Sequence, residues 1–238
     1  MPPVVGGVAV VIPTFNEAES IGAVVAELPR DIVDRIIVVD GGSTDGTQER
    51  ARNAGADVIA VGRGYGLACL TGAQAADGAD IIVFMDGDGA DDPAAIAALV
   101  APIRAGDYDF IIASRARGER EPGSMASHQI LAGLVAGRLT KLLYGVRYTD
   151  MCAFRAIRRD TLLTLRMREL TYGWNLEMQM RVARAGLRVL ELPVGYRRRI
   201  GGQSKVAGSL RGSIKAGLKI ISTFARVAIE PARQRAGP

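Results

Sequence analysis

Two aspartates separated by one glycine offer the clearest chemistry in the sequence. Asp86, Gly87 and Asp88 follow the apolar run 81–85, and residues two apart on an extended chain point to the same side. Hard divalent cations take carboxylate oxygens, and Mg²⁺ completes its shell with water and substrate phosphates. The motif therefore predicts a metal site that a diphosphate completes, although a turn rich in Asp and Gly without a metal is the alternative for the motif alone.

Three more loops of polar and glycine residues follow predicted strands in the first half of the chain. They span residues 13–17, 40–47 and 63–68. The carboxyl ends of parallel strands meet at one edge of an α/β sheet, where ligands bind. Ordinary turn chemistry explains any one loop, but together the loops predict a crevice of nucleotide size. A dinucleotide fingerprint is excluded because Cys69 occupies its third glycine position, and the sequence contains no Walker A motif.

Short β-branched runs alternate with alanine-rich stretches over the first 115 residues. This alternation is typical of β-α units that build an α/β fold with an open, mostly parallel, twisted sheet flanked by helices. Strands are expected at 8–12, 35–40, 57–61, 81–85, 110–113, 153–157, 188–193 and 195–199. Helices are expected at 18–28, 44–54 with Ser43 or Thr44 as its cap, 66–76, 93–103, 128–144, 173–185 and 209–229.

The two parts of the chain carry opposite charge. Residues 1–100 contain 5 arginines and 15 acidic side chains, whereas residues 101–238 contain 25 basic and 10 acidic side chains. An anionic ligand or surface is therefore expected to bind the second part. A nucleic acid is not expected as the partner, because no recognisable docking element accompanies the basic residues.

The last predicted helix, residues 209–229, is amphipathic. Arg211, Lys215 and Lys219 recur at four-residue steps, while the large apolar side chains occupy a different arc. Such a helix suits the interface of an anionic membrane, and the alternative is a helix packed on the domain with its basic face in water. The sequence has no run of 18 apolar residues and no basic leader before its apolar start. Two cysteines form no disulfide framework, so we expect a cytoplasmic protein bound peripherally to the inner face of the membrane.

Several motifs resemble those of one enzyme family. Segments 12–17, 38–47 and 86–88 are similar to the sugar-nucleotide-binding signature of glycosyltransferase family 2. Segments 150–155, 172–178 and 199–205 resemble the later motifs of polyprenyl-phosphate glycosyltransferases, the dolichol-phosphate mannose synthase group. The resemblance covers about residues 7–222. It implies a GT-A fold, a nucleotide-sugar donor of the GDP-mannose or UDP-glucose type, and inversion at the anomeric carbon.

The resemblance also implies roles for individual residues. Ala90 stands where many relatives have a glutamine ligand, so water or Asp91 is the expected replacement. Glu177 is either a base for a hydroxyl acceptor or the partner of an arginine, and we favour the second interpretation. The implied sites are nucleotide-sugar contacts at Pro13, Phe15, Glu17, Asp40, Gly64, Gly66, Asp86 and Gly87, Mg²⁺ or Mn²⁺ on Asp86 and Asp88, acceptor phosphate on Arg115, Arg155, Arg199 and Lys205, and catalysis by Asp88, Arg155 and Arg199.

The expected function is metal-dependent, inverting transfer of one sugar to a polyprenyl phosphate at a membrane surface. We expect a GT-A domain at 1–205, with a donor half at 1–115 and an acceptor half at 116–205, and a basic amphipathic helix and tail at 206–238. A family 2 transferase acting on a hydroxyl and a non-catalytic nucleotide-binding module are the alternatives. The sequence leaves the donor sugar, the prenyl chain length and the oligomeric state open.

Overall fold

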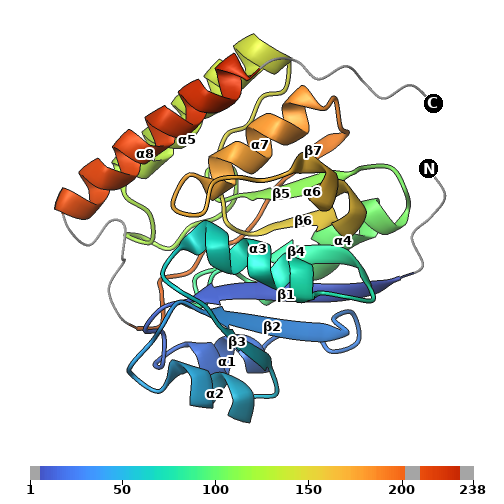
Figure 1. The fold of residues 1–238 in the computed structure, drawn as a ribbon, viewed down its shortest axis with the longest axis vertical. Coiled ribbons are helices and arrows are strands. Elements are labelled where there is room, and N and C mark those ends of the chain that lie inside the picture. Colours follow the sequence, from blue (N-terminus) through green and yellow to red (C-terminus); the bar gives the residue numbers. More distant parts are fainter. Residues whose placement is uncertain (1–5, 202–209, 231–238) are drawn as a thin grey trace.

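One mixed sheet runs through the part of the chain that the structure describes (Figure 1). The computed structural model describes residues 6–201 and 210–230, with side chains from residue 217 onward in the second segment. The strand order is β3-β2-β1-β4-β6-β5-β7, and β6 is antiparallel to both its neighbours while the other pairs are parallel. The strands are β1 (Gly7–Thr14), β2 (Arg35–Asp40), β3 (Asp57–Ala60), β4 (Ala79–Phe84), β5 (Phe110–Ser114), β6 (Arg155–Arg158) and β7 (Val189–Pro193).

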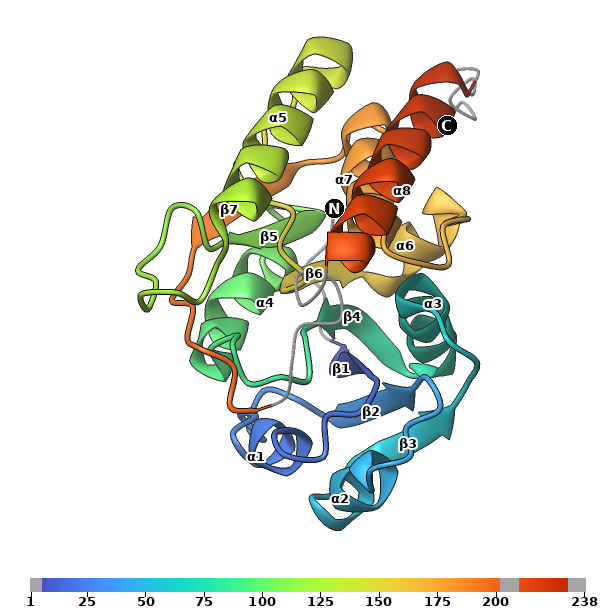
Figure 2. The ribbon, with the colours of Figure 1, turned by 90° about the vertical axis from the view of Figure 1, so that its left-hand side faces the viewer.

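Helices cover both faces of the sheet, with α3 on one face and α4 on the other (Figure 2). Helix α7 contacts both α5 and α8, and the three lie together at one end of the molecule. The helices are α1 (Ile21–Ala26), α2 (Thr47–Asn53), α3 (Tyr65–Ala75), the 3₁₀ turn η1 (Pro93–Ala95), α4 (Ile96–Arg104), α5 (Ser127–Tyr144), α6 (Arg159–Leu165), α7 (Trp174–Arg184) and α8 (Leu210–Ile229).

The strands consist mainly of valine, isoleucine and alanine because the sheet is covered on both faces. Strand β1 is buried from Val8 onward, and β2 from Ile36 onward. Continuous apolar runs of this kind are typical of parallel strands that contact helices on both sides. The expected mostly parallel α/β sheet with flanking helices and a C-terminal helix is confirmed.

The strand predicted at 195–199 is wrong. The Tyr196 amide donates to the Glu119 carbonyl at 2.9 Å, and the Arg197 amide donates to the Ala90 carbonyl at 2.9 Å. This segment therefore pairs with two different loops and forms only isolated bridges, since neither loop offers a continuous ladder.

Helices α1 and α2 begin later than predicted, and α6 was not predicted. Helix α1 begins late because the Glu17 amide donates to the hydroxyl of Thr47, the first residue of α2, and the Ala18 amide donates to the Asp45 carboxylate. Helix α2 follows Gly46, whose φ is 92°, so the predicted cap at Ser43 or Thr44 is wrong. Helix α6 has seven residues, of which only two are buried. Its apolar pattern is therefore too short to be recognised in the sequence.

The sheet brings loops from most of its strands to one edge. The parallel strands direct their carboxyl ends to that edge, and the antiparallel β6 begins there. Thr14 at the end of β1 lies in register with Asp40 at the end of β2, and Val11 of β1 with Phe84 at the end of β4. Loops that are far apart in the sequence therefore converge around the Asp-Gly-Asp segment.

Gly72 marks the point where α3 approaches the sheet most tightly. A Cβ atom there would lie 2.3 Å from one methyl carbon of Val11 and 3.0 Å from one of Val39. We expect Gly72→Ala to lower the free energy of unfolding by about 1–2 kcal/mol, because stiff β-branched neighbours must move to admit the methyl group. Urea denaturation measures the change. In the matched variant Gly22→Ala no atom lies within 4 Å of the added Cβ, so stability should rise by up to about 1 kcal/mol; equal losses in both variants would contradict the packing argument.

Candidate active site

Three aspartates lie together in the loop after β4. Asp86 and Asp88 hold the positions that the sequence assigns to a metal, and the Asp91 carboxylate accepts the Asp86 amide at 3.1 Å. Burial, followed by repulsion from Asp88, raises the pKa of Asp86 well above its usual value. Burial, followed by repulsion from Asp86 and Asp88, does the same to the pKa of Asp91. Carboxylates crowded in this way favour a bound cation.

The segment 196–201 lies across this acidic loop. The amides of Arg197 and Ile200 donate to the carbonyls of Ala90 and Asp88, both at 2.9 Å. The Arg199 guanidinium forms an ion pair with the Asp88 carboxylate, whose other oxygen accepts the Ala90 amide at 3.0 Å. Nη1 of Arg199 is buried and has no hydrogen-bond partner among the described residues. The predicted residues Asp88 and Arg199 are thus brought together, with one donor left over.

Arg115 lies near the acidic loop but is bound to another carboxylate. Its Nε and Nη2 donate to the two oxygens of Asp150, both at 2.8 Å, and its amide donates to the same group at 2.9 Å. Its guanidinium lies 4.9 Å from the centre of the Tyr196 ring, and its positive charge opposes the rise in the pKa of Asp86. Arg115 therefore adds positive charge beside the predicted metal site while Asp150 fixes its orientation.

The sequence predicts that Arg155 binds the acceptor phosphate, but the structure buries its side chain completely. Its Nε donates to the Ala153 carbonyl at 3.2 Å, its Nη1 to the Asn175 carbonyl at 3.0 Å, and its Nη2 to the Cys152 carbonyl. Burial lowers its pKa. In this position the side chain braces the loop before β6 against the start of α7, and the structure does not bring it to the surface beside Arg199.

Asp40 is also fully buried, and its own loop occupies its carboxylate. Oδ2 accepts the amides of Gly42 and Ser43 at 3.1 and 2.8 Å and the Gln48 side-chain amide at 2.8 Å. Oδ1 accepts the hydroxyls of Ser43 and, at 3.4 Å, Thr14. Asp40 therefore shapes the loop after β2 and presents no free oxygen to a nucleoside in this structure.

The end of β1 carries three of the residues predicted to contact the donor. Pro13 lies inside the strand, and Phe15 and Glu17 follow it. The Arg63 guanidinium, from the loop after β3, lies 3.7 Å from the centre of the Phe15 ring. The Glu17 carboxylate is near enough to the acidic loop to raise the pKa of Asp86. Arg63 was missed as a partner of Phe15, although its loop was recognised.

The predicted glycines are needed for close packing. A Cβ atom at Gly64 would lie 2.6 Å from the Leu170 carbonyl oxygen, and one at Gly66 would lie 2.2 Å from the Glu169 carbonyl oxygen. A Cβ atom at Gly87 would lie 2.9 Å from a methyl carbon at the end of β1. These glycines therefore admit neighbouring backbone and side chains, whether or not they also admit a ligand.

Glu177 orients arginines, as favoured from the sequence. It is fully buried, and its carboxylate pairs with Arg181 at 2.9 Å and Arg226 at 3.0 Å. Burial opposes ionisation, but hydrogen bonds from two amides and the two arginines hold the pKa of Glu177 below its usual value. Such a group has no access to an acceptor hydroxyl. Lys205, the remaining predicted phosphate ligand, lies outside the described residues.

Two further residues of the site have no motif and were missed. The Ser20 hydroxyl donates to the Gly87 carbonyl at 2.7 Å and so ties α1 to the acidic loop. Tyr196 provides the ring beneath Arg115. Tyr196 could have been found from the sequence, because it directly precedes three consecutive arginines. Nothing in the sequence distinguishes Ser20 as a residue of the site.

Asp86 and Asp88 fit a metal that is shared with a substrate. Within residues 6–201 and 217–230, no group of three or more His, Cys, Asp or Glu side chains is arranged to hold an ion by itself. Magnesium commonly uses one or two carboxylates together with substrate phosphates. Two neighbouring aspartates at the edge of the sheet therefore match a metal site that a diphosphate completes.

Comparisons with known proteins agree with this geometry. Residues 9–165 match the family model described as glycosyl transferase family 2. An uncharacterized glycosyltransferase of Mycobacterium bovis is 38% identical over 222 residues, which cover 90% of this chain and 98% of that protein. The undecaprenyl-phosphate mannosyltransferase of Micrococcus luteus is 32% identical over 226 residues, which cover 86% of this chain and 89% of that protein.

A solved structure shares the fold over nearly the whole chain. Glucosyl-3-phosphoglycerate synthase from Mycobacterium tuberculosis, in complex with Mn²⁺, UDP-glucose and phosphoglyceric acid, matches with a TM-score of 0.75 at 25% identity, covering 95% of this chain and 81% of that chain. The mixed sheet with flanking helices is the GT-A arrangement that the motifs implied. The family match and the identity to relatives of nearly equal length establish that the chain belongs to glycosyltransferase family 2.

Proposed function

We propose that this glycosyltransferase moves one hexose from a nucleotide sugar to a polyprenyl phosphate. The observation that carries the proposal is the acidic loop 86–91 with the cations Arg199 and Arg115 beside it. Groups suited to a metal and groups suited to phosphate oxygens thus adjoin at one edge of the sheet. The relative from Micrococcus luteus is named as an undecaprenyl-phosphate mannosyltransferase, which supports a polyprenyl phosphate as the acceptor.

On the donor side, Asp86 and Asp88 would hold Mg²⁺ or Mn²⁺. A divalent cation supplies several kcal/mol of stabilisation to the charge that develops on a departing diphosphate. Arg199 contributes donors to the same phosphate oxygens, since its Nη1 is without a protein partner among the described residues. The Mn²⁺ and UDP-glucose bound by the structural neighbour support this assignment.

On the acceptor side, an ionised phosphate makes a general base unnecessary. The second pKa of a phosphate monoester is about 6, so its oxygen is largely deprotonated at pH 7. This oxygen attacks the anomeric carbon, a carbon–oxygen bond forms with inversion, and the bond to the nucleoside diphosphate breaks with its electron pair. No proton has to be removed. The full burial of Glu177, the candidate base, is in keeping with this chemistry.

A phosphorylated small molecule with a reacting hydroxyl is the second candidate acceptor. It is favoured by the structural neighbour, which is a glucosyl-3-phosphoglycerate synthase crystallised with phosphoglyceric acid. Such a reaction needs a base for the hydroxyl proton. Glu177 does not meet that need because both its oxygens accept hydrogen bonds inside the fold.

Helices α5 and α8 support a peripheral membrane location. Arg138, Lys141 and Arg147 line, with Leu142, a hollow of about 600 Å³, and neither helix contains an acidic residue. Apolar side chains beside cations suit an anionic bilayer surface. No helix in the described part of the chain is long and apolar enough to cross a bilayer. Among the described side chains of these helices, the exposed large apolar ones are Leu131, Val135, Leu139, Leu142 and Leu143 on α5 and Leu218, Ile221 and Ile229 on α8.

Removing the metal, or one of its proposed ligands, should abolish transfer. In excess EDTA, and separately in Asp88→Asn, we expect the initial rate of sugar transfer to fall at least about 100-fold, because several kcal/mol of charge stabilisation is lost. Added Mn²⁺ should restore only the EDTA-treated enzyme. The control Asp92→Asn keeps the side-chain oxygen that caps η1 and loses one exposed ion pair, so its rate should stay within about threefold. A full rate in EDTA contradicts the metal site.

The acceptor class is tested with matched lipids. A radiolabel assay compares a short prenyl phosphate, the corresponding prenyl alcohol and 3-phosphoglycerate, each with GDP-mannose and with UDP-glucose. We expect the prenyl phosphate to react at least about 100-fold faster than the alcohol, because only the phosphate is ionised without a base. Preference for 3-phosphoglycerate would establish the second candidate, and absence of transfer to any acceptor would favour a nucleotide-binding module.

The proposed membrane-binding surface is tested by introducing a negative charge on α5 and, separately, on α8. Leu142 is 81% and Leu218 is 64% exposed, so Leu142→Asp and Leu218→Asp should fold normally. We expect each variant to bind vesicles of 30% phosphatidylglycerol at least about fivefold more weakly, because a carboxylate at the apolar boundary is repelled and desolvated. Co-sedimentation measures the binding. Leu163→Asp, on the exposed side of α6, is the control, and equal weakening in all three variants would contradict the assignment.

A further inference from the structure

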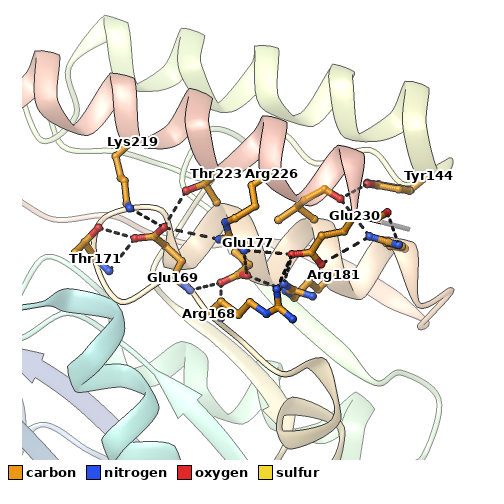
Figure 3. Close-up of polar contacts among 12 residues, drawn as sticks. Tyr144, Arg168, Glu169, Thr171, Glu177, Arg181, Lys219, Thr223, Arg226 and Glu230 are labelled. Carbon is orange, nitrogen blue, oxygen red and sulfur yellow. Dashed lines mark hydrogen bonds and ion pairs between the residues drawn. The ribbon is translucent and has the colours of Figure 1, made fainter. Parts of the chain in front are cut away.

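A cluster of buried and half-buried charges fastens α8 to the body of the protein (Figure 3). Two of its acidic members are Glu169, in the loop before α7, and Glu177 on α7; they are 4% and 0% exposed. Its members on α8 are Lys219, Thr223 and Arg226. We call these five residues the α8 clamp. Each of the two acids accepts donors both from α8 and from the loop 168–171.

Glu169 joins α8 to the loop 169–172. Its Oε2 accepts the Thr223 hydroxyl at 3.1 Å and lies 3.1 Å from the Lys219 ammonium nitrogen. Its Oε1 accepts the amide and hydroxyl of Thr171 at 3.0 and 2.6 Å. Gly173 shows how closely α8 approaches, because a Cβ atom there would lie 2.3 Å from the Thr223 hydroxyl oxygen. The conformation of the loop thus depends on a side chain that α8 holds.

Glu177 holds the same loop from the other side. Its Oε2 accepts the amides of Arg168 and Glu169 at 2.9 and 2.6 Å. Its Oε1 accepts one nitrogen of Arg226 at 3.0 Å and one of Arg181 at 2.9 Å. One arginine of α8 therefore neutralises a carboxylate that fixes two consecutive amides of the loop, and its loss would leave that buried charge less compensated.

The opposite side of the loop caps α3 at the donor edge of the sheet. The first amides of a helix lack partners within the helix, and Gly64 at the N-cap position provides no side-chain cap for α3. The Leu170 carbonyl accepts the Leu67 amide at 2.9 Å and so replaces that cap. Gly64 and Gly66 have no room for a Cβ atom because the loop 169–170 lies against them.

We propose that the α8 clamp sets the position of the loop after β3, through the Leu170 carbonyl, and that Glu169 and Glu177 are positioning residues for donor binding. Arg63, which stacks on Phe15, directly precedes the capped turn of α3. An unbroken series of contacts therefore runs from α8 through Glu169 and Leu170 to the side chains proposed for the nucleoside. Where α8 rests on a membrane, docking and donor affinity are linked through this series, and linkage of that kind is reciprocal.

Amide hydrogen exchange tests the inference without assuming any activity. In Glu169→Gln and Arg226→Ala, we expect the Leu67 amide to exchange at least about fivefold faster, because the carbonyl that accepts it is no longer held. The amides of β1 should exchange as in the unchanged protein. Tyr144→Phe is the matched control, since it removes a 3.5 Å contact between α5 and α8 that involves no member of the clamp. Thr223→Val, which keeps the side-chain shape, takes the place of either variant that does not fold.

Donor affinity gives the second readout, which rests on the proposed function. With Mn²⁺ present, calorimetry measures the Kd of UDP and of GDP; we expect Glu169→Gln and Arg226→Ala to raise the Kd of whichever nucleotide the unchanged protein binds by about three- to tenfold, and Tyr144→Phe to leave it unchanged. If the unchanged protein binds neither nucleotide, the proposed function fails while exchange still decides the inference. Faster exchange in α8 with an unaltered Leu67 amide would overturn the inference, because the clamp would then only attach the helix.

Discussion

Repulsion among carboxylates at the end of β4 is the constraint around which the site is arranged. Asp86, Asp88 and Asp91 lie within one short loop, largely out of water, and each of the first two raises the pKa of the third. Buried like charges are unfavourable unless cations compensate them. Arg115, directly after β5, and Arg199, in the segment after β7, provide part of that compensation. The acidic loop therefore needs the second half of the chain even before a substrate binds, and it retains capacity for a further cation.

The opposite charges of the two parts of the chain form ion pairs with each other in the folded protein. Arg197 forms ion pairs with Glu27 and Asp92, both at 2.9 Å, and so joins the segment after β7 to the first half. Arg199 does the same through its ion pair with Asp88, whereas Arg115 pairs with Asp150 and acts on the acidic loop through its charge. Part of the basic excess is thus used inside the fold and is not available to an external anion. On α8, Lys219 and Arg226 likewise pair with Glu169 and Glu177. The excess that an anionic surface can attract therefore includes the exposed Arg138 and Lys141 of α5, a helix without an acidic residue.

The strands and the convergence of their loops could be predicted because both follow from local patterns. Continuous β-branched runs identify buried strands, and parallel pairing then places their carboxyl ends at one edge. The contacts of individual residues could not be predicted in the same way. From the sequence, Arg155 is indistinguishable from a surface cation, because only the strand order places β6 inside the sheet. Asp40 is likewise indistinguishable from a free carboxylate, because only the folded loop after β2 brings the Ser43 amide to it. The role of Glu177 could be predicted because Arg181 lies four residues further along the same helix, a spacing that allows an ion pair.

Several residues that carry the family resemblance shape backbone in this structure. Asp40 closes the loop after β2, Gly64 and Gly66 make room for the loop 169–170, and Arg155 fixes three carbonyl groups. A motif of this kind specifies where loops lie, and loops of the same shape can serve different donors and acceptors. The acidic loop 86–88 and Arg199 belong to the motifs themselves, so chemical selectivity must come from other side chains that the shaped loops leave accessible. This division explains why the motifs identify the family reliably while the choice between a lipid phosphate and a small phosphorylated acid depends on residues outside them.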